Sequence, residues 1–217
     1  MDALAALALQ LEWGADEALA DTPVVRFAAE APPASLPAPA SRPVPVPAPA
    51  PVSRIAPPVV SRAEQAAAAA DSLAALRAAL EGFEGCTLRD TATNLVFQDG
   101  NPDAGLMIVG EGPGAEEDRA GLPFVGPSGR LLDRMLGSIG LDRTRCVITN
   151  VIFWRPPGNR TPTDTEVLTC LPFLLRHVSL VRPQRIVLLG AMATKAITGN
   201  TDGIRKLRGR WLELPVP

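Results

Sequence analysis

Short apolar runs alternate with helical patterns from Gly105 onward, and this alternation predicts the fold class. The runs Leu106–Val109, Cys146–Val151 and Arg185–Leu189 are compact, rich in β-branched residues and bounded by Gly, Asn or Pro. Such runs are typical of strands that are buried on both faces of a sheet. Because helical patterns separate them, the order strand–helix–strand–helix–strand predicts an α/β domain with a central parallel sheet.

Two helices are predicted between these strands. The first has apolar residues at helical spacing, namely Leu131, Leu132, Met135, Leu136 and Ile139. The second begins at the capping box Thr163–Glu166, in which each side chain binds a backbone N–H group of the other residue. We place Pro172 in the first turns of this helix, where a missing N–H group costs less than in mid-helix. Its apolar face comprises Val167, Cys170, Leu171, Leu174 and Val178.

The N-terminal part of the chain divides into three segments. Residues 1–30 contain an amphipathic stretch with Leu4, Leu7 and Leu11 on one face, and the sequence leaves open whether it docks on the main domain, contacts a partner or frays. Residues 31–60 hold 11 of the 23 prolines and 7 alanines, which predicts a disordered, extended linker. Residues 61–217 form the folded domain, which opens with a capping box at Ser61–Glu64 and a helix to about Leu80.

Several classes of protein are excluded at this point. No apolar run is long enough to span a bilayer, so we expect no contact with a membrane. Asp2 and the lack of a basic N-terminal region argue against a secretory signal. Three cysteines in 217 residues do not make a disulfide scaffold. We therefore expect a cytoplasmic protein.

Charge is unevenly distributed along the chain. The formal net charge is −2, yet residues 136–217 carry 12 Lys or Arg against 5 Asp or Glu. The densest group is Arg205, Lys206, Arg208 and Arg210. A solvated face is one interpretation of such a group, and contacts to a phosphate backbone are the other.

The loop after the first predicted strand carries the most informative motif. Its sequence is Gly110-Glu111-Gly112-Pro113-Gly114, and ligands of open α/β sheets bind at the carboxyl ends of the strands. The glycines allow a close approach of the backbone, and Glu111 is the one side chain of the loop with chemical capability. A dinucleotide site is disfavoured, because Pro113 removes a donor and three carboxylates at 116–118 would repel a pyrophosphate.

Two further residues suit a flat ligand. Phe124 lies between turn residues in Gly121–Gly126, where it is either a core residue or a platform on which a base stacks. Asn150 ends the second predicted strand, where it is either a turn former or the donor and acceptor pair for an imide edge.

These motifs together resemble the family 4 uracil-DNA glycosylases. The segments Gly110–Asp118, Gly121–Gly126, Ile148–Asn150 and Arg155–Arg160 agree with that family in order and spacing, within a match over residues 86–211. The resemblance implies a three-layer α/β/α fold that hydrolyses the N-glycosidic bond of a flipped uracil in single- or double-stranded DNA. It assigns the water-activating role to Glu111, a backbone contact to Gly112, stacking to Phe124 and recognition of the base edge to Asn150. The DNA-contact candidates are Arg155, Arg160 and the basic group 205–210.

The chain departs from the family at the ligands of its [4Fe–4S] cluster. The resemblance places the four ligand cysteines at positions occupied here by Phe83, Cys86, Trp154 and Cys170. With only two of four ligands left, we expect no metal or cofactor, in preference to the family's cluster. Cys146 falls inside a predicted strand and is expected to be a core thiol.

The second departure concerns the C-terminal end. Family members continue with a strand and a His-containing loop, which we expect this 217-residue chain to lack, with impaired excision as the consequence. The one histidine, His177, is interpreted as a surface or satisfied helix residue. The alternative function is a non-catalytic DNA- or partner-binding remnant of the fold. We expect a monomer, with the N-terminal segment as the contact for a repair or replication partner.

Overall fold

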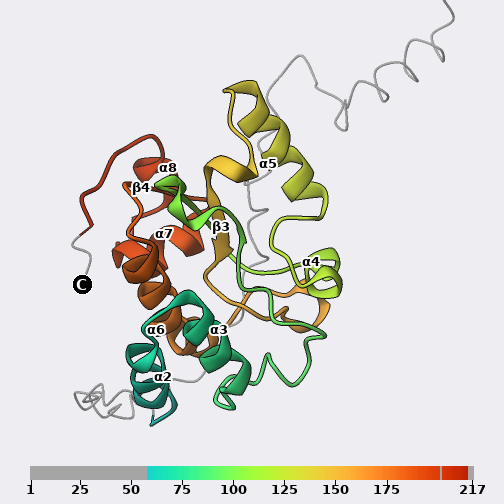
Figure 1. The fold of residues 1–217 in the computed structure, drawn as a ribbon, viewed down its shortest axis with the longest axis vertical. Coiled ribbons are helices and arrows are strands. Elements are labelled where there is room, and N and C mark those ends of the chain that lie inside the picture. Colours follow the sequence, from blue (N-terminus) through green and yellow to red (C-terminus); the bar gives the residue numbers. More distant parts are fainter. Residues whose placement is uncertain (1–57, 201, 215–217) are drawn as a thin grey trace, which may run out of the picture. The chain divides into compact units, whose positions relative to one another are not determined.

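The computed structural model describes residues 58–200 and 202–214, and these residues belong to one compact unit (Figure 1). The predictions for the N-terminal segment and for most of the linker lie outside the described residues. The last three residues assigned to the linker, 58–60, are helical. None of the helices in the described ranges is long and apolar enough to cross a membrane.

A four-stranded sheet forms the centre of this unit, in the order β1-β3-β2-β4. Its strands are β1 (Asp99–Gly100), β2 (Leu106–Gly110), β3 (Val147–Asn150) and β4 (Arg185–Leu188). β2 pairs in parallel with β3 and β4, which confirms the predicted parallel centre. The antiparallel edge strand β1 was not predicted, because two residues are too short to show an alternating pattern.

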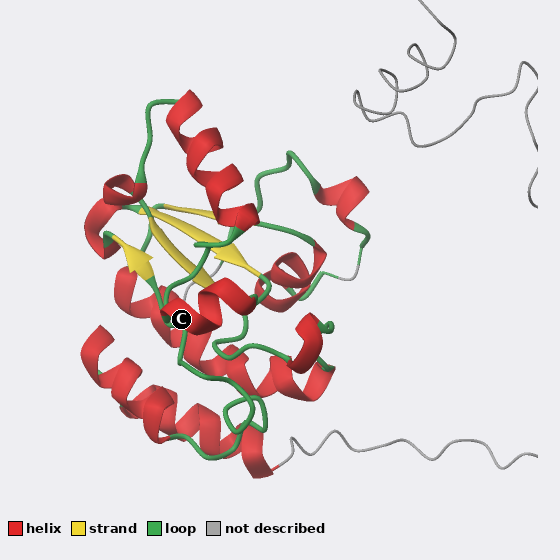
Figure 2. Cartoon of the chain, turned by 90° about the vertical axis from the view of Figure 1, so that its right-hand side faces the viewer, coloured by secondary structure: helices red, strands yellow, loops and turns green. Residues whose placement is uncertain are grey.

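Helices cover both faces of the sheet, as Figure 2 shows. On one face, Ile108 and Ile148 pack against Leu132 and Leu136 of α5 (Pro127–Ser138), together with the predicted core thiol of Cys146, which is fully buried. On the other face, Met107 and Val147 belong to a larger core with helices α2 (Pro58–Ala69), α3 (Leu73–Gly82), α6 (Asp164–Val181) and α7 (Ala191–Thr198). Neighbouring residues of β2 thus serve opposite cores, which is the alternation of a strand between two layers. The remaining helical elements are η1 (Pro102–Ala104), α4 (Ala115–Ala120), η2 (Arg143–Arg145), η3 (Pro157–Asn159), α7 (Ala191–Thr198) and α8 (Ile204–Leu207).

The helix predicted from Ser61 to Leu80 is in fact two helices. α2 spans Pro58–Ala69, so the proposed capping residue Ser61 lies inside it, and α3 spans Leu73–Gly82. Ser72 begins α3, because its side chain accepts a hydrogen bond from the Ala75 N–H group at 3.2 Å. A proline is favourable at the first position of a helix, which explains the earlier start at Pro58.

The long helix α6 (Asp164–Val181) begins where the capping box predicted. Thr163 Oγ1 accepts from the Glu166 N–H group at 3.3 Å, and Glu166 Oε2 accepts from the Thr163 N–H group at 2.7 Å. Pro172, however, lies in the middle of the 18-residue helix and not in its first turns. The helix continues past this missing hydrogen bond because the neighbouring Phe173 and Leu174 are fully buried in the core.

Helix α5 buries less of its apolar face than the pattern suggests. Leu132 and Leu136 are buried, whereas Leu131, Met135 and Ile139 are 49%, 59% and 69% exposed. One layer of sheet contacts only a narrow stripe of a helix, so the periodicity identified the helix but overstated its buried face.

Candidate active site

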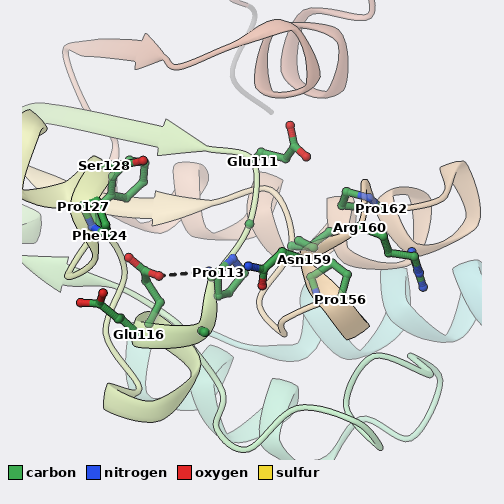
Figure 3. Close-up of a pocket in the computed structure, with 15 residues that line it drawn as sticks. Glu111, Pro113, Glu116, Phe124, Pro127, Ser128, Pro156, Asn159, Arg160 and Pro162 are labelled. Carbon is green, nitrogen blue, oxygen red and sulfur yellow. Dashed lines mark hydrogen bonds between the residues drawn. The ribbon is translucent and has the colours of Figure 1, made fainter. Parts of the chain in front are cut away.

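A cavity of about 420 Å³ lies at the carboxyl ends of β2 and β3. Figure 3 shows Phe124 and Ser128 on one side of it and Asn159 and Arg160 on the other, with the loop from Glu111 between them. The loop follows β2 directly. It is hydrogen-bonded to the segment after β3, because the Ile152 N–H group donates to the Glu111 carbonyl oxygen at 3.1 Å. The cavity therefore lies where ligands of parallel α/β sheets bind.

Glu111 offers an available carboxylate at this cavity. Its side chain is exposed and lines the cavity, and it has no hydrogen-bond or ion-pair partner among residues 58–200 and 202–214. The backbone on both sides of it is bound to the segment after β3, through Val151 and Ile152. A carboxylate on a fixed backbone can orient a water molecule or stabilise a positive charge that develops on a ligand.

Gly112 is required by packing as well as by its place in the cavity wall. A Cβ atom at this position would lie 2.5 Å from Ile152 Cγ1 and 2.7 Å from Ile152 Cδ1. Any side chain would therefore displace Ile152, another residue of the cavity wall. The structure therefore places Gly112 in the wall of the cavity, and its contact with a base stays a prediction.

Asn150 presents an amide that satisfies none of its hydrogen-bonding groups. The residue is 1% exposed at the end of β3, and within the described residues neither Nδ2 nor Oδ1 has a hydrogen-bond partner. A buried polar group left unpaired costs about 1–3 kcal/mol of folding free energy, so such groups are rare in native proteins. An amide kept in this state is matched to a ligand that supplies both an acceptor and a donor.

Phe124 lies beside this amide. A Cβ atom on Gly110 would lie 2.5 Å from Phe124 Cζ and 2.6 Å from Asn150 Oδ1, so the ring and the amide approach the same point of β2. Phe124 lines the cavity and is only half-buried, which leaves its ring available for stacking. Of the four residues to which the resemblance assigned a role, Glu111, Gly112 and Phe124 line the cavity, whereas Asn150 is buried beside Phe124 and is not one of the lining residues.

Glu117 is a site residue that the sequence interpretation missed. Its Oε2 accepts from the Gly114 N–H group at 3.1 Å, and its Oε1 accepts from the Gly126 N–H group at 2.7 Å. One carboxylate therefore joins the loop after β2 to the loop that carries Phe124. The available signal was its position three residues after Gly114, at the start of α4, where a Glu side chain reaches back to the preceding backbone.

The predicted DNA-contact residues are divided between two places. Arg160 lines the cavity, but its guanidinium donates to both oxygens of Glu166, at 2.9 and 2.6 Å. The hydrogen bonds from Arg160 are the largest cause that lowers the pKa of Glu166 to about 2. Arg155 donates to Asn159 at 2.7 Å.

The basic group lies elsewhere. Arg208 and Arg210 line a separate cavity beside β4 with Trp211, and Arg205 and Lys206 are exposed on α8.

The side chains at the four positions of the family's cluster ligands form part of the apolar core. Phe83 is 8% exposed and packs edge-on against Phe173 with 5.2 Å between ring centroids, and Trp154 is 3% exposed. Cys86 and Cys170 are the only thiols in the set, and a hydrogen bond between them lowers the pKa of Cys86 and raises that of Cys170. A [4Fe–4S] cubane held by the protein requires four thiolates. Two thiols and two packed aromatic rings do not fit such a cluster.

His177 lies in the core and not at the cavity. It is fully buried, its Nε2 lies 2.5 Å from Gln98 Oε1, and its ring stacks on Phe97 with 4.8 Å between centroids. Burial lowers its pKa to about 4. The interpretation as a surface residue is wrong. The interpretation as a satisfied helix residue holds for Nε2 only, because Nδ1 has no hydrogen-bond partner within the described residues.

Comparison with known proteins identifies the family of this chain. Residues 97–217 match the Uracil DNA glycosylase superfamily. The chain is 49% identical over 133 residues to a type-4 uracil-DNA glycosylase of Archaeoglobus fulgidus, covering 59% of this chain and 67% of the relative. It is 44% identical over 131 residues to one of Thermotoga maritima (58% and 68%) and 44% identical over 118 residues to one of Pyrobaculum aerophilum (54% and 60%).

The chain therefore belongs to the Uracil DNA glycosylase superfamily, and its similarity to type-4 members confirms the family that its motifs indicated. It spans about three fifths to two thirds of the length of these relatives.

Proposed function

We propose that this protein hydrolyses the N-glycosidic bond of uracil in DNA. The observation that carries the proposal is the buried, unpartnered amide of Asn150 beside the ring of Phe124. Uracil presents an N–H donor next to a carbonyl acceptor on its Watson–Crick edge. One planar base can therefore satisfy both orphaned groups of the amide while it stacks on the aromatic ring.

The reaction follows from the remaining residues of the cavity. The base must first leave the duplex, at a cost of about a few kcal/mol for unstacking and unpairing. When the C1′–N1 bond breaks, its electron pair leaves with the uracil anion and positive charge develops on the sugar. The carboxylate of Glu111 stabilises that charge and orients the water that adds to C1′. The added water loses one proton to the Glu111 carboxylate, which passes it on to solvent, and the uracil anion takes up one proton from solvent, so the products are free uracil and an abasic site.

Contacts to the phosphate backbone are expected from the exposed cations. Arg205, Lys206, Arg208 and Arg210 have exposed side chains and are not committed to a buried partner. Arg160 is a weaker candidate, because Glu166 already occupies its guanidinium.

The substrate is uracil-containing DNA, single- or double-stranded, bound by a monomer. All three cysteines are free thiols, which suits the reducing cytoplasm.

The protein works without an iron–sulfur cluster. Phe83 and Trp154 fill the space of two cluster ligands with apolar packing, and the remaining thiols of Cys86 and Cys170 are 3% and 1% exposed. No group of three or more His, Cys, Asp or Glu side chains gathers as a metal site in the described part of the chain. The chemistry proposed above uses only side chains of the protein and water.

The test is release of uracil from an oligonucleotide, measured as abasic sites under single-turnover conditions. We expect Asn150→Asp, which keeps the shape but loses the donor, and Glu111→Gln to slow release by about a hundredfold or more. Asn200→Ala, remote from the cavity, is the matched control and should release uracil at the wild-type rate. If the wild type and all variants bind DNA equally and none releases uracil, the protein is a non-catalytic DNA-binding member of the superfamily.

A further inference from the structure

The guanidinium of Arg143 lies at the junction of three segments behind the cavity. Arg143 begins η2, and its Nη1 donates to Asp99 Oδ2 of β1 at 2.6 Å. Its Nε and Nη2 donate to the carboxylate of Asp133 on α5 at 2.9 and 3.2 Å. It also donates to two consecutive carbonyl oxygens, to Pro123 at 3.2 Å through Nη1 and to Phe124 through Nη2.

These contacts use the full donor capacity of the side chain. A guanidinium has five N–H groups, and five hydrogen bonds leave Arg143 here. The side chain is only 24% exposed, and the pKa is raised because the carboxylates of Asp133 and Asp99 outweigh the effect of burial. No donor is left for a phosphate or a base, so any effect of Arg143 on a ligand must pass through the groups that it binds.

The group that connects Arg143 to the site is the backbone of Phe124. Phe124 has a φ of 56°, in the left-handed region that residues with a Cβ atom seldom adopt. Its carbonyl oxygen also contacts the backbone of Gly129, where a Cβ atom would lie 1.7 Å from that oxygen. Gly129 and Arg143 thus confine the carbonyl, and surrounding contacts of this kind are what maintain an unfavourable backbone conformation.

The backbone conformation decides where the ring of Phe124 points. We propose that Arg143 is a positioning residue that holds Phe124 in its left-handed conformation and so places the ring beside the amide of Asn150. The inference rests on the proposed function for its effect on uracil release. Asp99 and Asp133 in turn fix the guanidinium, which gives the two-residue edge strand β1 a role in the site.

The geometry predicts that lysine cannot replace Arg143. The four acceptor groups lie around a planar fork, whereas an ammonium group has three donors in a tetrahedral arrangement. We therefore expect Arg143→Lys to keep the charge and to lose part of the positioning, and Arg143→Ala to lose it all.

The first experiment is a double-mutant cycle on uracil release, with Arg143→Ala, Phe124→Ala and the double variant. We expect Arg143→Ala to lower the single-turnover rate by about tenfold or more, with a DNA dissociation constant within about threefold of wild type. In the Phe124→Ala background the same change should have an effect of less than about twofold, because its target is gone. Equal effects in both backgrounds, or a wild-type rate for Arg143→Ala, would overturn the proposal.

The second experiment does not depend on activity. Amide hydrogen exchange of the intact chain should speed up by about tenfold over residues 122–130 in Arg143→Ala, less so in Arg143→Lys, and remain unchanged over α6. Asp133→Asn keeps the arginine and should give an intermediate effect, while Arg77→Ala, which removes an exposed ion pair with Glu81, is the control. Unchanged exchange over 122–130 would overturn the proposal even if uracil is released. Lack of release by the wild type would contradict only the proposed function.

Discussion

The ring of Phe124 and the amide of Asn150 meet at the point that a side chain on Gly110 would occupy, 2.5 Å from the ring and 2.6 Å from the amide oxygen. Because Gly110 has no side chain, the ring of Phe124 and the amide of Asn150 can approach each other. Phe124 is also on the wall of the cavity (Figure 3), whereas Gly110 and Asn150 are not among the residues that line it.

Gly110→Ala is expected to push Phe124 and Asn150 apart. Overlaps of this size cannot be relieved without moving either the ring or the amide, so uracil release should fall by about tenfold or more. The measurement is the single-turnover rate. Gly137→Ala is the control, since nothing lies within 4 Å of a Cβ atom there and the helix should gain slightly in stability. An unchanged rate for Gly110→Ala would show that the ring has room to shift.

Glu117→Gln is expected to loosen the two loops of the cavity. Only one amide oxygen remains to accept from Gly114 and Gly126, and an amide donor faces the other N–H group. The free energy of unfolding in urea should fall by about 1–3 kcal/mol, with a slower release of uracil. Glu116→Gln, which changes an exposed ion pair with Arg130, should alter the stability by less than about 1 kcal/mol.

Stability is expected to decrease with falling pH in two steps. Burial lowers the pKa of His177 to about 4, so between pH 6.5 and 4 the unfolded chain binds a proton that the folded chain does not. Stability from this residue is complete above pH 6.5 and falls by about 3 kcal/mol on acidification to pH 4. The lowered pKa of Glu166, about 2, adds a further loss between pH 4.5 and 2.

The measurement is the free energy of urea unfolding at several pH values for the wild type and His177→Leu. The variant should be nearly independent of pH between 6.5 and 4.5, whatever its overall stability. A wild-type curve that is flat over that interval would contradict the buried, neutral histidine.

Iron content tests the lack of a cluster. Protein purified without oxygen should contain less than about one tenth of the four iron and four sulfide per chain that a cubane requires. The double variant Phe83→Cys/Trp154→Cys restores four cysteines at these positions and is the positive comparison. A stoichiometric cluster in the wild type would show that other ligands replace the two missing thiols.

Local sequence patterns determined the elements that depend on neighbouring residues. The apolar runs located β2, β3 and β4, and the capping box at Thr163 located the start of α6, because burial on both faces and helix capping leave signals within a few positions. The order and spacing of the glycine-rich loop, Phe124 and Asn150 were enough to indicate the family. The break between α2 and α3 was missed, since an alanine-rich helical pattern masks a serine that caps a new helix.

The tertiary structure alone decided how the site is held. The bridge from Glu117 to Gly126 and the contacts of Arg143 join positions that are at least nine residues apart in the sequence. The amide of Asn150 has no partner at all within the described residues. Such contacts are set by how the layers pack around the sheet, and a buried polar atom is satisfied or orphaned only after that packing is complete. For this reason the sequence could name the residues proposed to contact a base, but not the residues that hold them in place.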